Sequence, residues 1–197
     1  MNTQEFTLSS LDKPIKIPDQ QINEFREKGH TLIRGLLSEG EVAASRNIIA
    51  GAVEKFNTEK RKMEDRDTYG KAFLQIKNFW QNDVDVKKIV LSKRLGRVAA
   101  DLLGAENVRI YHDQALFKEP GGGHTPWHQN LYYWPLDTDK TITMWMPLVD
   151  IDVKMGMLTF ASRSHQNGSV LDYEISDKSE EEFDKYVREN NLEISRA

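Results

Sequence analysis

The stretch Val-Arg-Ile-Tyr-His-Asp-Gln-Ala-Leu-Phe, residues 108–117, decides the fold class, because apolar residues recur there at every second position. Alternate side chains of an extended strand share one face, so this stretch predicts a β-strand with two distinct sides. One side carries Val108, Ile110, His112, Gln114 and Leu116, and the other carries Arg109, Tyr111, Asp113, Ala115 and Phe117. We expect the first side, with Gln114, to point into a β-structure.

Helical patterns precede this strand. A helix over about 20–28 is expected to end at Gly29, since glycine often follows the last helical residue, and a short strand over 31–33 follows. Ser38 and Glu41 have the spacing of a capping box and predict the start of a second helix. Its apolar residues form one stripe at three- and four-residue spacing: Val42, Ile48, Ile49, Ala52, Val53 and Phe56.

Two further helices are expected, one over about 92–103 and one within 177–191. Ser179 and Glu182 are spaced as a cap pair for the last helix. Helices come first and strands afterwards, without a repeating alternation of strand and helix. This order predicts an α+β fold, with helices packed against an antiparallel β-structure, and argues against a doubly wound sheet.

A length of 197 residues and a hydrophobic content of 39% suit one domain with one core. We expect a single domain over 1–197, with a helical part over 1–106 and a β-core over 107–197.

The charge pattern excludes some partners. The 27 basic and 31 acidic residues give a net charge of −4 without a long block of either sign, so neither nucleic acid nor an anionic membrane is an expected partner. No apolar run approaches the ~20 residues needed to cross a bilayer. The chain has no cysteine, and residues 1–5 lack the basic and apolar pattern of a leader, so we expect a cytoplasmic protein.

The candidate site lies in Gly-Gly-His-Thr-Pro-Trp-His-Gln-Asn-Leu-Tyr-Tyr-Trp-Pro, residues 122–135. On a strand, His128 and Asn130 would point toward the same spot and could touch one ion. A histidine and a carboxylate at this spacing, with a distant second histidine, form the facial triad of non-haem iron(II) oxygenases. The alternative is that His128 is a hydrogen-bonded packing residue beside aromatic side chains.

Several blocks resemble the phytanoyl-CoA dioxygenase family in sequence, order and spacing. They are residues 21–25, 29–33, 111–120, 127–135, 144–152, 156–160 and 162–165. The resemblance implies a double-stranded β-helix, which is a jelly-roll or cupin-like fold, and hydroxylation coupled to decarboxylation of 2-oxoglutarate at iron(II). It implies that His128 and Asn130 hold the metal, and that Gln114, Trp145 and Gln75 contact 2-oxoglutarate.

The chain departs from the family pattern at three places. Asn130 stands where the family carries aspartate, and neither the distal histidine nor the arginine that grips 2-oxoglutarate has a counterpart. His165 lies in the block where the family has a turn and not a ligand.

Two hypotheses follow for the function. One is an iron(II)/2-oxoglutarate dioxygenase acting on a small organic or acyl substrate, and the other is a non-catalytic remnant that serves as a binding or interaction module. We expect a barrel that is incomplete at its C-terminal end. Apolar surface near Trp145 and Phe160 should then be exposed and could allow self-association.

Overall fold

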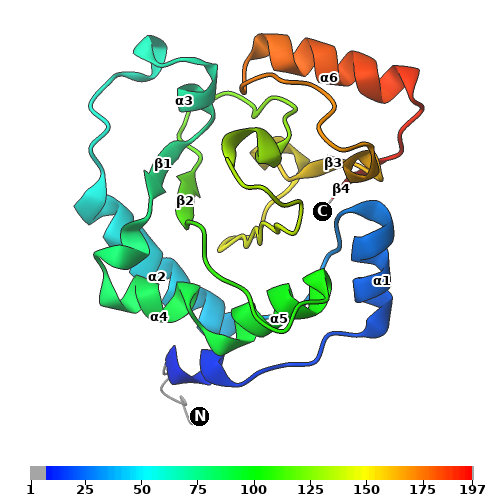
Figure 1. Ribbon diagram of the computed structural model, residues 1–197. Coiled ribbons are helices and arrows are strands. Elements are labelled where there is room, and N and C mark those ends of the chain that lie inside the picture. Colours follow the sequence, from blue (N-terminus) through cyan, green and yellow to red (C-terminus); the bar gives the residue numbers. More distant parts are fainter. Residues whose placement is uncertain (1–7, 197) are drawn as a thin grey trace.

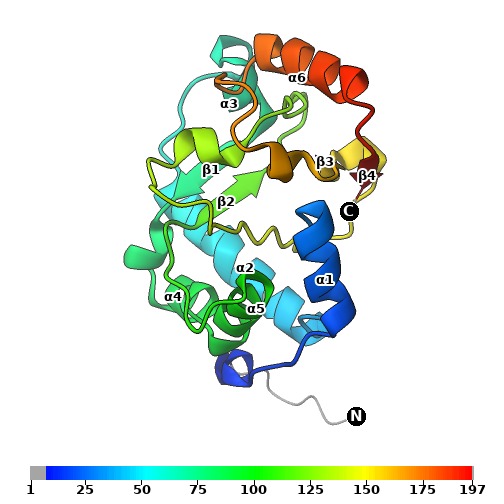
Figure 2. The ribbon, with the colours of Figure 1, turned by 45° about the vertical axis from the view of Figure 1, so that its right-hand side comes forward.

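The computed structural model describes residues 8–196, so the expectation about residues 1–5 lies outside the described residues. The elements surround a set of irregular segments at the centre of the molecule, with α6 at one end and α4 and α5 at the other (Figures 1 and 2). The helices are α1 (Asp19–Lys28), α2 (Glu39–Phe56), α3 (Thr68–Ala72), α4 (Val84–Val90), α5 (Lys93–Leu103) and α6 (Asp177–Glu189). The strands are β1 (Leu74–Lys77), β2 (Gln114–Phe117), β3 (Thr159–Ala161) and β4 (Ile194–Arg196). The 3-10 turns are η1 (Leu8–Asp12), η2 (Met63–Asp65), η3 (Phe79–Gln81), η4 (Asn130–Tyr133), η5 (Val153–Met155) and η6 (Ser164–Asn167).

Local signals position the long helices. The capping box of α2 is confirmed, because the Ser38 hydroxyl accepts from the Glu41 backbone N–H and the Glu41 carboxylate accepts from the Ser38 N–H. Gly29 and Gly104 adopt the left-handed conformation and end α1 and α5, which lie where helices were expected. The cap pair expected for α6, Ser179 with Glu182, is wrong. The helix is capped three residues earlier, by Ser176, whose hydroxyl accepts from the Ser179 N–H.

The strands are fewer and shorter than expected. β1 pairs antiparallel with β2, and β3 with β4, as two separate two-stranded sheets in the described part of the chain. Residues 108–113 and 31–33 form no strand, because an extended segment becomes a strand only where a neighbour completes its hydrogen bonds. The boundary at 106/107 does not separate helices from strands, since β1 precedes it and α6 follows it.

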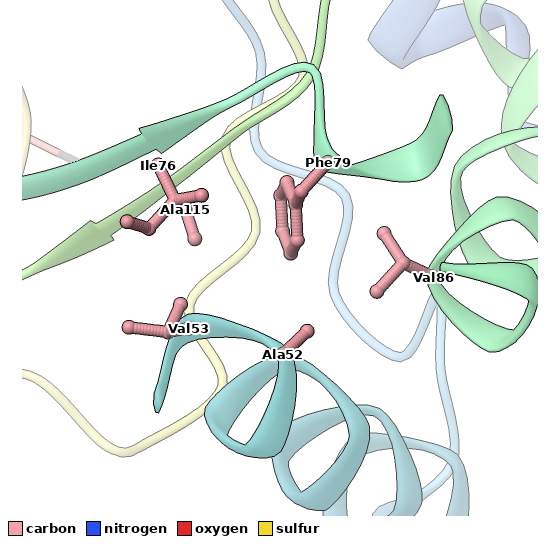
Figure 3. Packing of buried hydrophobic residues seen from close by; sticks show 6 residues of the cluster. All are labelled: Ala52, Val53, Ile76, Phe79, Val86 and Ala115. Carbon is pink, nitrogen blue, oxygen red and sulfur yellow. The ribbon is translucent and has the colours of Figure 1, made fainter. Parts of the chain in front are cut away.

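One core cluster joins the first sheet to the helices beneath it. Ile76 of β1 and Ala115 of β2 are register partners, and both face α2 (Figure 3). They pack with Ala52, Val53, Phe79 and Val86. The sheet therefore turns the face that carries Ile76 and Ala115 toward the helices, and the opposite face away from them.

A second cluster lies between α1, α5 and a central segment. Ile17, Val98 and Leu102 are its buried members, and Ile142 and Met144 pack against them. Since residues 142 and 144 contact the same cluster, the alternate residues of this segment are expected to face away from the helices.

A buried ion pair ties the N-terminal region to α5. The Arg94 guanidinium donates to the Glu41 carboxylate at 2.8 Å and to the backbone oxygens of Ser10, Lys13 and Leu36. Burial raises the pKa of Glu41, but hydrogen bonds from Ser10, from the Ser38 N–H and from Arg94 outweigh it and lower this pKa to about 2. The pair is thus fully hydrogen-bonded, which a buried charge requires.

No helix within residues 8–196 is both long enough and apolar enough to cross a lipid bilayer.

Candidate functional site

His128 lies in an irregular segment and is half-buried. Its Nδ1 atom is 2.9 Å from the backbone oxygen of Pro126. A carbonyl oxygen can only accept, so Nδ1 carries a proton, and in the neutral ring Nε2 then has the lone pair. This is the tautomer that a metal-binding histidine needs when its second nitrogen bonds a carbonyl.

Asn130 is exposed and begins η4, so the expectation that His128 and Asn130 share a β-strand is wrong. Within residues 8–196 no other segment pairs with this one as a ladder, and it forms a 3-10 turn instead. Gln129, between them, nevertheless keeps an extended backbone. The Asn130 side-chain nitrogen donates to the Thr143 hydroxyl at 3.3 Å, which leaves its oxygen available as a ligand.

The segment around His128 is held from one side by residues 168–180. The Glu180 carboxylate accepts from the Trp127 N–H at 2.7 Å. The Gln129 amide donates to the Gly168 oxygen and accepts from the Val170 N–H. The Tyr133 hydroxyl accepts from the Ile175 N–H at 2.6 Å. Side-chain contacts with α6 and the loop before it thus take the place of a strand ladder.

Gln75 and Gln114 lie on the same face of the first sheet. In the register, Gln75 pairs with Leu116 and Lys77 with Gln114, on the face turned away from the helices. The prediction that Gln114 is buried is wrong, since its side chain is exposed. This face is therefore exposed at Gln114, where β2 begins.

Gln75 is the more enclosed of the two amides. Its side-chain oxygen is buried without a hydrogen-bond partner among the described residues. Burial raises the pKa of the neighbouring Tyr69 hydroxyl, as does Tyr133, while a hydrogen bond with Gln75 lowers it. A buried amide oxygen without a hydrogen bond costs about 1–3 kcal/mol. A ligand that donates a hydrogen bond to the Gln75 oxygen would therefore bind favourably on this face of the sheet.

Trp145 is half-buried and lies in a segment without strand pairing, so its expected strand is not formed. Met144 packs on the helices, whereas Thr143 contacts Asn130. Alternation then puts Trp145 on the Asn130 side of the segment. The Phe160 ring is half-buried and stacks on the His30 ring, with 4.5 Å between the ring centroids. The exposed apolar side chains that were expected near Trp145 and Phe160 include Val149 and Ile194.

Two of the other histidines, His30 and His165, have structural contacts. His30 is 2.8 Å from the Ser162 hydroxyl, and burial, together with Lys28, lowers its pKa. His30, Phe160 and Ser195 belong to the lining of a cavity of about 360 Å³, which contains none of the predicted site residues. The His165 Nε2 atom is 3.3 Å from the backbone oxygen of Arg26 in α1.

The donor set does not fit a complete iron site. His128 and Asn130 provide two donors, both of them neutral, and no group of three or more His, Cys, Asp or Glu side chains that could hold a metal ion occurs within residues 8–196. Two protein ligands are too few to fix a divalent ion against water. Sequence reasoning missed Thr143 and Glu180, because their contacts span 13 and 53 residues and no local pattern marks them.

Comparisons with known proteins agree on the fold. A solved structure of the non-heme α-ketoglutarate-dependent carbocyclase SnoK from nogalamycin biosynthesis matches with a TM-score of 0.72 and 21% identity, over 94% of this chain and 73% of that one. This likeness confirms the fold class, an α+β arrangement with a jelly-roll that is incomplete within the described residues.

A curated relative from Stutzerimonas stutzeri, "Probable alpha-ketoglutarate-dependent hypophosphite dioxygenase", is 27% identical over 164 residues. The match covers 78% of this chain and 55% of the relative, so the chain spans about half the length of that protein. The family model for phytanoyl-CoA dioxygenase matches residues 25–193. The chain therefore belongs to the phytanoyl-CoA dioxygenase family of iron(II)/2-oxoglutarate-dependent oxygenases.

Proposed function

We propose that this chain is part of an iron(II)/2-oxoglutarate-dependent dioxygenase that hydroxylates a small organic or acyl molecule. The family match over residues 25–193 carries the proposal. The His128 tautomer supports it, since the bond to Pro126 uses Nδ1 and leaves Nε2 free, and the bond from Asn130 to Thr143 leaves the Asn130 oxygen free. Two relatives are named as α-ketoglutarate-dependent enzymes, one of them acting on hypophosphite, which supports a small-molecule substrate.

Three side chains are proposed to face the cosubstrate. Gln75 and Gln114 lie together on the sheet face turned away from the helices, and Trp145 is expected on the Asn130 side of its segment. The proposal includes a cytoplasmic location, supported by a cysteine-free sequence without a disulfide framework.

A non-catalytic binding module is the second candidate. Asn130 favours it, because a neutral amide brings no charge to a divalent ion, and so does the lack of a three-residue ligand cluster in the described chain.

Iron binding separates the two candidates. Anaerobic titration with iron(II) should show weak binding by the chain and none by His128→Ala. Asn130→Asp should tighten binding by about tenfold or more, since it restores a charged ligand beside the imidazole. If iron(II) binding is the same in all three proteins, His128 is not a metal ligand and the binding-module hypothesis stands.

Turnover is the second test, measured as succinate formed from 2-oxoglutarate after oxygen is added. We expect little or none from the 197-residue chain or from Asn130→Asp, because the second imidazole and an arginine for the 2-oxoglutarate carboxylate are lacking. The Asn130→Asp chain should form succinate if it is extended by any downstream coding sequence that carries a histidine and then an arginine. Succinate release by the unmodified chain that is lost in His128→Ala would show that Asn130 serves in a working site.

A further inference from the structure

One peptide unit connects His128 to α6. The carbonyl oxygen of this unit belongs to Pro126 and lies 2.9 Å from His128 Nδ1, and its N–H belongs to Trp127 and donates to the Glu180 carboxylate at 2.7 Å. The C–N bond between these two groups has partial double-bond character, so both lie in one plane and share their electrons. Glu180, the peptide unit and the imidazole therefore form one continuous series of two hydrogen bonds.

Both ends of this series are held in place. Pro126 is fully buried, and its ring fixes the backbone φ angle. Glu180 lies in the first turn of α6, directly after the fully buried Ser179. The Ser176 hydroxyl accepts from the Ser179 N–H, and the Ser176 backbone oxygen accepts from the Glu180 N–H. The turn from which the Glu180 side chain extends is thus fixed by its own cap.

The series favours one tautomer of His128. Hydrogen bonds in series polarise one another, so a carboxylate that accepts from the Trp127 N–H raises the electron density on the Pro126 oxygen. A more negative oxygen is a better acceptor for an Nδ1–H group, and it repels the lone pair that Nδ1 carries in the other tautomer. A histidine whose second nitrogen serves as a ligand commonly donates to a carboxylate or to a backbone carbonyl. Here the carbonyl acts on the ring directly and the carboxylate acts through the peptide bond.

We propose that Glu180 is a positioning residue for His128, which holds the ring as the Nδ1–H tautomer through the Pro126–Trp127 peptide unit and so presents Nε2 as a lone-pair donor. The use of that lone pair rests on the proposed function. The tautomer does not, because it is a property of the chain without any ligand. Glu180 lies 53 residues from Trp127 in the sequence, so no local motif marks this role.

A second hydrogen bond separates this role from that of a mechanical tether. The Ile175 N–H donates to the Tyr133 hydroxyl at 2.6 Å and ties the same segment to the loop before α6, without involving the Pro126–Trp127 peptide unit. Loss of either bond loosens the segment, but only the loss of Glu180 changes the acceptor of His128. Tyr133→Phe is therefore the matched control for Glu180→Ala.

The test is the tautomer of His128 in the chain without added metal, read from the ring nitrogen chemical shifts by NMR at about pH 8.5, where histidine side chains are neutral. His128→Ala assigns the signals. We expect the Nδ1–H form to dominate, and its ratio to the Nε2–H form to fall by about fivefold or more in Glu180→Ala. Glu180→Gln should fall by only about twofold, since its amide oxygen still accepts from the Trp127 N–H without a charge. Tyr133→Phe should leave the ratio unchanged.

Three results would overturn the proposal: a wild-type ring that is mainly Nε2–H, a ratio that Glu180→Ala leaves unchanged, and equal falls in Glu180→Ala and Tyr133→Phe. Circular dichroism verifies folding. If Glu180→Ala does not fold, Glu180→Gln is compared with Tyr133→Phe: a lower ratio in Glu180→Gln alone supports the proposal, and equal ratios refute it. The iron(II) titration is read separately, because a chain with the expected tautomers that binds no iron(II) would keep the role of Glu180 and refute the metal site.

Discussion

Asp113 has both carboxylate oxygens buried, and neither has a partner with hydrogen-bond geometry among the described residues. Burial raises the pKa of Asp113 to about 6, and the nearby backbone N–H groups of Trp80 and Asp113 oppose this only in part. Folding therefore raises the affinity of this carboxyl group for its proton. The contribution of Asp113 to the free energy of unfolding is fully present below the ordinary pKa of 3.8 and is lost as the pH rises through about 6.

Replacement of Asp113 by asparagine should remove that loss. At pH 7 we expect Asp113→Asn to raise the free energy of unfolding by about 1 kcal/mol, a figure reduced for solvent screening because Asp113 as a residue is only partly buried. The gain should disappear near pH 4, where the wild-type carboxyl group is protonated in the folded state. Urea unfolding at both pH values measures it, with the exposed Asp172→Asn as control. A gain that is equal at pH 4 and pH 7 would contradict the assignment.

The Arg94–Glu41 pair behaves in the opposite sense. Because the pKa of Glu41 is lowered to about 2, its contribution to stability is present above its ordinary value of 4.5 and is lost as the pH falls toward 2. Arg94→Ala leaves a buried carboxylate without its partner and should cost about 3–5 kcal/mol in urea unfolding at pH 7. Arg188→Ala, in the exposed pair with Asp184, should cost at most about 0.5 kcal/mol. Similar costs for both would show that Arg94 does little for stability.

At the scale of elements, sequence patterns predict the helices well and the strands poorly. A capping box and a left-handed glycine are local signals, and they locate α2 and the end of α1 within a residue or two. A strand depends on its partner, so the alternation in residues 108–117 could not show that only β2 would pair. Nor could it show which face meets the helices, because Ala115 is small and carries little hydrophobic signal.

From the sequence, only the part of the candidate site that lies within one short segment could be predicted. The His128–Asn130 pair follows from a short motif, and family resemblance adds Gln75, Gln114 and Trp145. The contacts that hold this pair come from distant residues, Thr143 and Glu180, whose roles exist only after folding.

The Glu180 contact carries a prediction for α6. Glu180→Ala frees the Trp127 N–H, and loss of a hydrogen bond to a charged group costs about 1.5–3 kcal/mol. Amides of residues 127–134 should then exchange about tenfold faster, while α6 itself stays folded. Glu181→Ala, an exposed neighbour on the same helix, should leave exchange unchanged. Equal effects of the two variants would mean that α6 stabilises this segment only by packing.

The whole molecule combines a packed helical layer with an open side. The two core clusters draw on α2, α4 and α5, whereas much of residues 134–156 is irregular. Stability is therefore expected to be unequal, with local opening in this range at a small fraction of the global free energy.

Limited proteolysis should reveal that inequality. At low micromolar concentration, trypsin should cut after Lys140 and Lys154 well before Lys185, although all three side chains are exposed. Lys185 lies in α6, which must unfold before a protease can bind it. Mass spectrometry of the first fragments decides the order. Initial cleavage at Lys185 would show that α6, and not the central segments, is the weakest part.

Two hydrogen bonds join the end of α1 to the region of η6, which is far from α1 in the sequence. The Arg163 N–H donates to the Lys28 oxygen, and the Gln166 amide donates to the Glu27 oxygen across 139 residues of sequence (Figure 1). During synthesis, at roughly 5–20 residues per second, the end of α1 leaves the ribosome on the order of ten seconds before η6 does. α1 can meet α5 in that interval, since both belong to the cluster around Val98. Docking of η6 is thus among the last events of folding, and a nascent chain that stalls before Ser162 exposes the end of α1 to chaperones.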